Sequence, residues 1–172
     1  MIFLVRTNGH MMVQGHELRC ALGRSGVRPA AAKREGDGAT PAGIWPIRRL
    51  LFRPDAGPAP RTRLAATPIQ PNDGWCDDPG DVLYNQQVSL PHTASAETLW
   101  RSDRLYDRVV VLGYNDDPII AGAGSAIFLH LAKPDYGATE GCVALADADM
   151  TTLLGLAAPG DAIRIDLPQA TA

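Results

Sequence analysis

A histidine and a cysteine in residues 126–145 are the residues best suited to covalent chemistry. His130 ends an apolar run. Cys142 lies twelve positions after His130 (142 minus 130) and directly follows Gly141. The thiolate is the reactive form of cysteine, and a nearby imidazole can lower the pKa of the thiol and accept its proton. Gly141 lets the backbone turn tightly, so that N–H groups around Cys142 can face a developing oxyanion. The pattern predicts a nucleophile, Cys142, with His130 as its base.

Taken singly, each residue has a plainer interpretation. A free cysteine is most often a small buried hydrophobe, and a lone histidine is more often structural than catalytic. Their shared loop favours the catalytic interpretation. Metal binding is disfavoured, because the stretch has no CxxC or HxxxH pair and a structural zinc site needs four ligands. We therefore predict no metal and no cofactor.

Composition excludes several classes of protein. The chain has 172 residues, of which 45% are hydrophobic and 20% charged, and its net charge is −3. This suits one soluble domain spanning residues 1–172. Nucleic-acid binding usually needs a basic patch, so we expect no nucleic-acid partner. No stretch approaches roughly 18 apolar residues, so we expect no membrane span. The start of the chain also lacks the basic leader and long apolar core of a signal peptide.

The elements that must position the two reactive residues are mostly strands. Residues 2–13 predict a hairpin with an Asn8-Gly9 turn, residues 18–22 alternate as a half-buried strand, and residues 109–112 form a continuous apolar strand. We also predict short helices, over residues 93–103 and after an Asp cap near residue 147, and a final alternating strand near 162–167. The expected fold class is mostly β (α+β).

One long loop and two further cysteines complete the pattern. Residues 54–74 contain five prolines and predict a stiff loop, either a plain surface excursion or a cap over the cleft; we favour the cap. Cys20 and Cys76 are each either paired or buried as free thiols, and burial is the simpler expectation for Cys20.

These motifs resemble the L,D-transpeptidase catalytic domain, the YkuD-type domain that cross-links bacterial peptidoglycan. The carriers of the resemblance are the segments Thr40-Pro-Ala-Gly-Ile-Trp45, His130-Leu-Ala132 and Thr139-Glu-Gly-Cys-Val-Ala-Leu145, and the closing helix and Pro-Gly-Asp turn. The family's Cys and His correspond to Cys142 and His130. The resemblance covers about residues 13–167 and implies a YkuD-like β-sandwich or barrel core.

The chain departs from the usual family pattern at two positions. The family's second His is Glu140 here, and its Arg after the Cys is Ala144. With Lys33-Arg-Glu-Gly-Asp-Gly38, these features are similar to a proteobacterial branch associated with 1,3 cross-links.

The resemblance also suggests which residues contact substrate. Lys33 and Arg34 would bind carboxylates of a stem peptide. Trp75 and Tyr84 would offer flat faces to a sugar, and Asn85 a donor and an acceptor. Thr139 and Glu140, which directly precede the Gly-Cys pair, would also contact substrate.

The resemblance implies a peptidoglycan L,D-transpeptidase that forms a thioester on Cys142 and acts on stem peptides and glycan. It also implies a periplasmic location, which conflicts with the missing signal peptide, and we expect a monomer. Three alternatives remain open: a cysteine peptidase or amidase that trims stem peptides, a non-catalytic wall-binding module, and a cytoplasmic thiol enzyme unrelated to the wall.

Overall fold

A computed structural model of the chain describes residues 1–168. Within these residues lie thirteen strands, one α-helix, α1 (Asp147–Leu156), and one short 3-10 helix, η1 (Ala30–Ala32). The predicted mostly β fold class is confirmed, although it has fewer helices than expected. The predicted domain end at residue 172 lies outside the described residues.

The main sheet closes on itself. Its strand order is β10-β11-β12-β3-β2-β1-β13-β5, and β5 also pairs with β10, so the path returns to its start as a barrel-like sheet. Two short strands, β4 and β6, each pair with β5. The strands of this sheet are β1 (Ile2–Arg6), β2 (His10–Val13), β3 (His16–Ala21), β4 (Val27–Pro29), β5 (Thr40–Phe52), β6 (Ala66–Pro68), β10 (Arg108–Leu112), β11 (Phe128–Leu131), β12 (Val143–Leu145) and β13 (Ala162–Ile165).

The N-terminal hairpin forms as predicted. Strands β1 and β2 pair antiparallel, with Leu4 opposite Met12, and Gly9 in the turn has a φ of 79°. A positive φ of this size is easily reached by glycine, which explains why the Asn-Gly step marks the turn.

The burial of both faces of strand β10 explains why its sequence is a continuous apolar run. Val110 and Leu112 point into the core enclosed by the main sheet, whereas Val109 and Val111 point to a second cluster on the outer face. A strand buried on both faces has no polar alternation. Cys142 belongs to the second, outer cluster.

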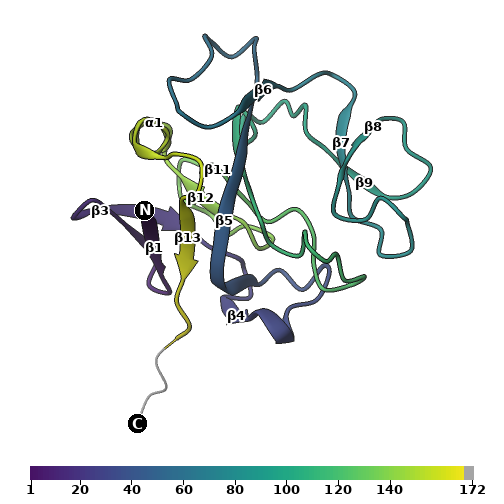
Figure 1. Cartoon of the computed structure of the whole chain (residues 1–172), viewed down its shortest axis with the longest axis horizontal. Helices are drawn as coiled ribbons and strands as arrows, with labels where there is room; N and C mark the ends of the chain where they lie inside the picture. The colour runs from purple at the N-terminus through teal and green to yellow at the C-terminus, as the bar shows by residue number, and fades with distance from the viewer. Residues whose placement is uncertain (169–172) are drawn as a thin grey trace.

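A second, three-stranded sheet covers that outer cluster. Its order is β8 (Gln87–Ser89), β7 (Asp73–Cys76) and β9 (Ala96–Thr98). Figure 1 shows these strands on the opposite side of β5 from β1, β3 and β13. The predicted helix over residues 93–103 is wrong, because residues 96–98 pair antiparallel with β7. Cross-strand pairing outweighs local helix propensity there.

Helix α1 follows β12, as predicted, and packs against β11. Met150, Leu153 and Leu154 form its buried face. The cap differs from the prediction, because Asp147 is the first helical residue and the N-cap is Ala146. Asp147 and Asp149 lie in the first turn, where negative charge complements the helix dipole.

The proline-rich segment does not cap the cleft that contains Cys142, which corrects the prediction. Residues 56–61 instead line a separate hollow together with Arg104, Arg108 and Thr151. The cover over the outer cluster comes from the three-stranded sheet and residues 99–106.

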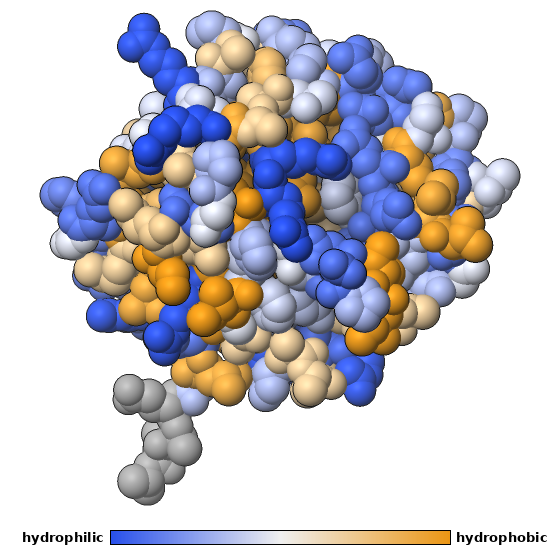
Figure 2. All heavy atoms as spheres, in the orientation of Figure 1, coloured by the Kyte–Doolittle hydropathy of each residue, from blue (hydrophilic) through white to orange (hydrophobic). Residues whose placement is uncertain are grey.

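The exposed hydrophobic residues are scattered among hydrophilic ones on the face shown in Figure 2. In the described part of the chain, no helix is both long and apolar enough to cross a membrane.

Candidate active site

Neighbouring parallel strands bring His130 and Cys142 to one face of the sheet. Strand β11 pairs with β12, with Leu129 opposite Val143 and His130 opposite Ala144. Side chains alternate along a strand, so residues 142 and 144 share a face with residues 128 and 130. Both His130 and Cys142 line one cleft of about 570 Å³, which is a usual size for a ligand site.

His130 is held in the tautomer that a base needs. Its Nδ1 lies 2.8 Å from the carbonyl oxygen of Leu131, an acceptor, so Nδ1 carries the hydrogen and Nε2 keeps a lone pair. The ring packs edge-on against Tyr106, with centroids 5.2 Å apart. Burial lowers the pKa of His130 to about 4. The imidazole is therefore neutral near pH 7 and able to accept a proton.

Cys142 is a protonated thiol in the resting site. Its Sγ lies 3.1 Å from the carbonyl oxygen of Ala126, to which it donates, and 3.4 Å from the N–H of Phe128, from which it accepts. Burial, and next the charge of Glu97, raise the pKa of Cys142 to about 12, while the nearby Lys33 acts in the opposite direction. No hydrogen bond joins the described Sγ and imidazole atoms, so the S–H must turn from Ala126 toward His130 to transfer its proton.

Thr139 shapes the loop that presents the cysteine. Its hydroxyl donates to the carbonyl oxygen of Cys142 at 2.7 Å and accepts from the N–H of Gly141 at 3.1 Å. Gly141 has a φ of +134°, and a Cβ there would lie 2.8 Å from the carbonyl oxygen of Ala39. The predicted tight turn at Gly141 is present, but its N–H is already bound within the loop. Thr139 also lines the cleft.

Trp75 and Asn85 support the wall beside Cys142. Asn85 Oδ1 accepts from the Trp75 indole N–H at 2.9 Å and from the Ala126 N–H at 3.0 Å. Its amide nitrogen donates to the carbonyls of Tyr114 and Asn115. Ala126 is the residue whose carbonyl contacts the thiol, so the Asn85 amide fixes the wall beside Cys142.

Burial corrects the prediction that Trp75 and Tyr84 offer flat faces to a sugar. Their residues are only 6% and 2% exposed, respectively. The Tyr84 hydroxyl donates to Glu35 and accepts from the N–H of Gly124. Glu35 itself lines the cleft, so Tyr84 positions a lining residue.

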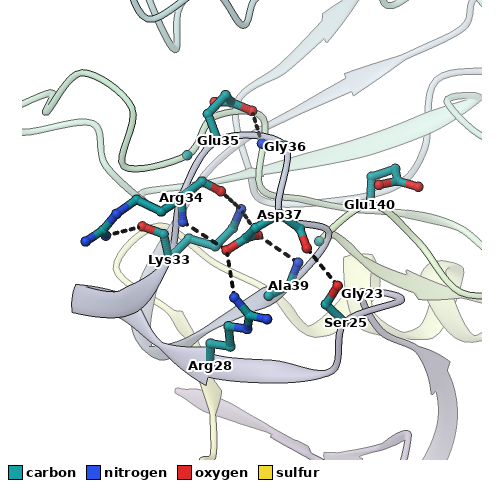
Figure 3. A network of polar contacts seen from close by, with 12 residues as sticks. Gly23, Ser25, Arg28, Lys33, Arg34, Glu35, Gly36, Asp37, Ala39 and Glu140 are labelled. Atoms are coloured by element: carbon teal, nitrogen blue, oxygen red, sulfur yellow. Dashed lines mark hydrogen bonds and ion pairs between the residues drawn. The ribbon is translucent and has the colours of Figure 1, made fainter.

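Lys33 is engaged within the protein, as Figure 3 shows. Its ammonium donates to Asp37 Oδ1 and to the Arg34 carbonyl, both at 2.7 Å, and its side chain is 2% exposed. Asp37 also accepts from the backbone N–H groups of Arg34 and Ala39. These contacts with Lys33 and the backbone lower the pKa of the Asp37 carboxyl despite its partial burial. Lys33 therefore organises its loop, and its charge already has a partner.

Arg34 and Glu140 are both exposed but differ in their position. The Arg34 guanidinium bonds the carbonyls of Ala31 and Lys33 and is not among the residues that line the cleft. Glu140 lies at the rim of the cleft and pairs with Arg24 at 2.8 Å. Arg24 thus fixes the residue that replaces the family's second histidine.

The segment wrongly predicted as a helix supplies lining residues that the sequence analysis missed. Half-buried Glu97 accepts from the Tyr106 hydroxyl at 2.6 Å and lies 3.5 Å from Arg101, and its partial burial raises the pKa of its carboxyl. Asp77 and Asp103 add further carboxylates to the lining. The density of charged and aromatic residues between 97 and 106 was the available signal, and an apolar helical face was the wrong interpretation of it.

All three cysteines, Cys20, Cys76 and Cys142, are free and buried. The alternative of a pair between Cys20 and Cys76 is therefore wrong. Burial raises the pKa of Cys20 to about 12, consistent with an inert thiol in the core.

Comparison with known proteins identifies one family. The model of the YkuD L,D-transpeptidase catalytic domain matches residues 1–165. A solved L,D-transpeptidase from Mycobacterium smegmatis aligns with a TM-score of 0.43 and 11% identity, over 96% of this chain and 58% of that one. No curated protein matches the chain.

Because the family model spans nearly the whole sequence, the chain belongs to the L,D-transpeptidase catalytic domain family. This chain spans a little over half the length of the solved relative.

Proposed function

We propose that this chain is a peptidoglycan L,D-transpeptidase that joins stem peptides through a thioester on Cys142. The observation that carries the proposal is the placement of Cys142 and His130 on one face of two adjacent strands, inside a single cleft. Family membership supplies the substrate class.

The acylation step uses three groups of the site. His130 Nε2 accepts the proton from Cys142, and the thiolate attacks an amide carbonyl of the donor stem. We assign the oxyanion to the N–H of Cys142, because the Gly141 N–H is occupied by Thr139. The imidazolium then gives its proton to the departing amine, the C–N bond breaks, and a thioester remains.

The acceptor step regenerates the thiol. An amine of a second stem, which the family resemblance identifies as the side-chain amine of diaminopimelate, attacks the thioester. His130 takes the proton lost by that amine and returns it to the leaving thiolate. The amine attacks in its neutral form, so only one proton passes through His130. Glu35, Asp77 and Glu97 line the cleft together with Lys33, Arg101 and Lys133, so charges of both signs face the substrate.

The 1,3 cross-link is the finer part of the proposal. Ala144 stands where the usual family Arg would be, and Glu140 stands where the second His would be. Both changes remove groups that would contact a donor stem, which is consistent with a donor bond after the first stem residue. Arg24 holds Glu140 at the cleft rim, so this position presents a carboxylate in a fixed place.

Two experiments test the proposal. Intact-mass analysis with meropenem, a carbapenem of the class that acylates this family's cysteine, should show one covalent adduct, absent from Cys142→Ala. Muropeptide analysis with the purified protein should then show 1,3-linked dimers. Only 3,3-linked dimers would rule out the 1,3 assignment, and stem digestion without dimers would favour a peptidase.

We further propose that residues 1–172 act as one monomeric catalytic domain in the periplasm, where the wall substrate lies. The family match over residues 1–165 supports the single domain. Fractionation of cells that express the native gene, with detection of the protein by antibody, tests the location. Size-exclusion chromatography with light scattering tests the monomer.

A further inference from the structure

A second cluster of reactive side chains lies outside the proposed catalytic machinery. Cys76 ends β7, Asp81 lies in the turn that follows, and His92 follows β8. One ligand atom from each, a sulfur, a carboxylate oxygen and an imidazole nitrogen, lies within 4.8 Å of the others. His92 Nε2 is 3.2 Å from Asp81 Oδ2. Three chemically different donors thus converge from three separate stretches.

The donor set suits a transition metal. Thiolate, imidazole and carboxylate are the three side-chain ligand types of zinc, with bonds of about 2.0–2.3 Å. Ligands around such a tetrahedral ion lie about 3.3–3.8 Å apart, so no pair of the three atoms needs to move closer by more than about 1.5 Å. Their chemistry favours zinc or a similar divalent ion over calcium or magnesium, which prefer oxygen ligands throughout.

The local charge also favours a cation. Asp77 and Asp78 lie between Cys76 and Asp81 in the chain, so carboxylates are dense around the three donors. A divalent ion would offset the negative charge and stabilise the thiolate.

The solvent accessibility of the three side chains favours metal binding over a second nucleophilic site. Cys76 is 0% exposed, so a peptide carbonyl cannot reach its sulfur. The side chains of Asp81 and His92 are each 16% exposed, which gives an ion and a water ligand a route from solvent.

We propose that Cys76, Asp81 and His92 bind one divalent transition metal ion, with zinc the favoured occupant and water as the fourth ligand. This proposal departs from the expectation of no metal, which was argued from the sequence around Cys142. The ion would tie β7 to the loops on both sides of β8. Asp77, next to Cys76, lines the catalytic cleft, so the ion would stiffen the cover of the cleft without touching the nucleophile.

Cobalt substitution tests the proposal directly. The full chain, with any affinity tag removed, is stripped with a chelator and titrated with Co²⁺. We expect a sulfur-to-cobalt charge-transfer band that saturates at one equivalent and is displaced by Zn²⁺. Cys142→Ala and Cys20→Ser should keep the band, whereas Cys76→Ser should lose it. His92→Ala should bind Co²⁺ at least tenfold more weakly, because one of three protein ligands is gone.

Thermal unfolding provides the second measurement. Zn²⁺ should raise the unfolding midpoint of the wild-type chain and of Cys142→Ala, but not that of His92→Ala, which keeps Cys76 buried and so guards against a simple folding defect. Absence of saturable cobalt binding by the folded wild-type chain would overturn the proposal. So would a band that survives Cys76→Ser and disappears in Cys142→Ala.

Discussion

At the scale of single residues, the nucleophile depends on a few backbone contacts. The thiol of Cys142 donates to one carbonyl and accepts from one N–H, and its loop is held by the Thr139 hydroxyl. These contacts aim the sulfur into the cleft while burial keeps it protonated. The neutral thiol therefore has to lose its proton before the sulfur can act as a nucleophile.

Removing the Thr139 hydroxyl should slow acylation. In Thr139→Val the bonds to the Cys142 carbonyl and the Gly141 N–H are both lost, and each hydrogen bond contributes about 1 kcal/mol. We expect acylation by meropenem to fall about tenfold or more, measured by time-resolved intact mass. Thr139→Ser keeps the hydroxyl and should stay within a few-fold of wild type. Equal rates for the two variants would contradict this role.

Gly141→Ala should both destabilise the domain and slow acylation. The added Cβ would approach the Ala39 carbonyl at 2.8 Å, and a φ of +134° is strained for alanine. We expect a loss of about 1–3 kcal/mol in the free energy of unfolding, measured by urea titration. Gly155→Ala is the matched control, because a Cβ there meets nothing within 4 Å and the site is helical. That control should be neutral or stabilising.

At the scale of elements, the side-chain amide of Asn85 joins the region of the three-stranded sheet to the main sheet by a hydrogen bond. The segment after β7 places Asn85 against Ala126, which links this sheet to the strand that carries His130. The sequence analysis expected Asn85 to contact substrate. In the structure its amide instead bonds Trp75 and backbone groups beside Cys142. Residue type could not reveal this, since an amide that bonds substrate and one that bonds backbone look the same in sequence.

Asn85→Ala should lower the free energy of unfolding and slow acylation. It leaves the N–H of Ala126 and the indole N–H of Trp75 without partners in a buried place. Unsatisfied buried groups cost about 1–3 kcal/mol each, so we expect about 2–5 kcal/mol less stability and a slower meropenem reaction. Denaturant unfolding measures the first effect and intact mass the second. Gln86→Ala changes an exposed neighbour and should leave both near wild type.

At the scale of the whole molecule, periodicity predicted the strands and the closing helix, because their apolar spacing is local. The hairpin at Asn8-Gly9, the two-faced strand at 109–112 and α1 all follow from it. The strand at 96–98 and the position of the proline-rich segment were mispredicted, because both depend on pairing and packing with distant residues. The sequence could predict that Cys142 and His130 lie near each other, but it could not predict that Glu97, Arg101 and Tyr106 line the same cleft.

The burial of His130 gives the whole domain a pH dependence. The pKa is about 4 in the folded protein and 6.5 as its ordinary value. The unfolded chain therefore takes up the proton first, so the free energy of unfolding should fall as pH drops from about 6.5 to about 4. The difference corresponds to about 3 kcal/mol. Urea unfolding at several pH values should show a weaker slope for His130→Gln, and identical slopes in the two proteins would contradict the assignment.

The pairing between the first and last strands has a consequence for biosynthesis. Strand β1 lies parallel to β13, with Ile2 opposite Ala162 and Val5 opposite Ile165. Contacts between segments so far apart in sequence form only when the later one is available. A nascent chain still held in the ribosome before residue 165 cannot complete the ring, so the native domain assembles only once almost all of these residues have emerged.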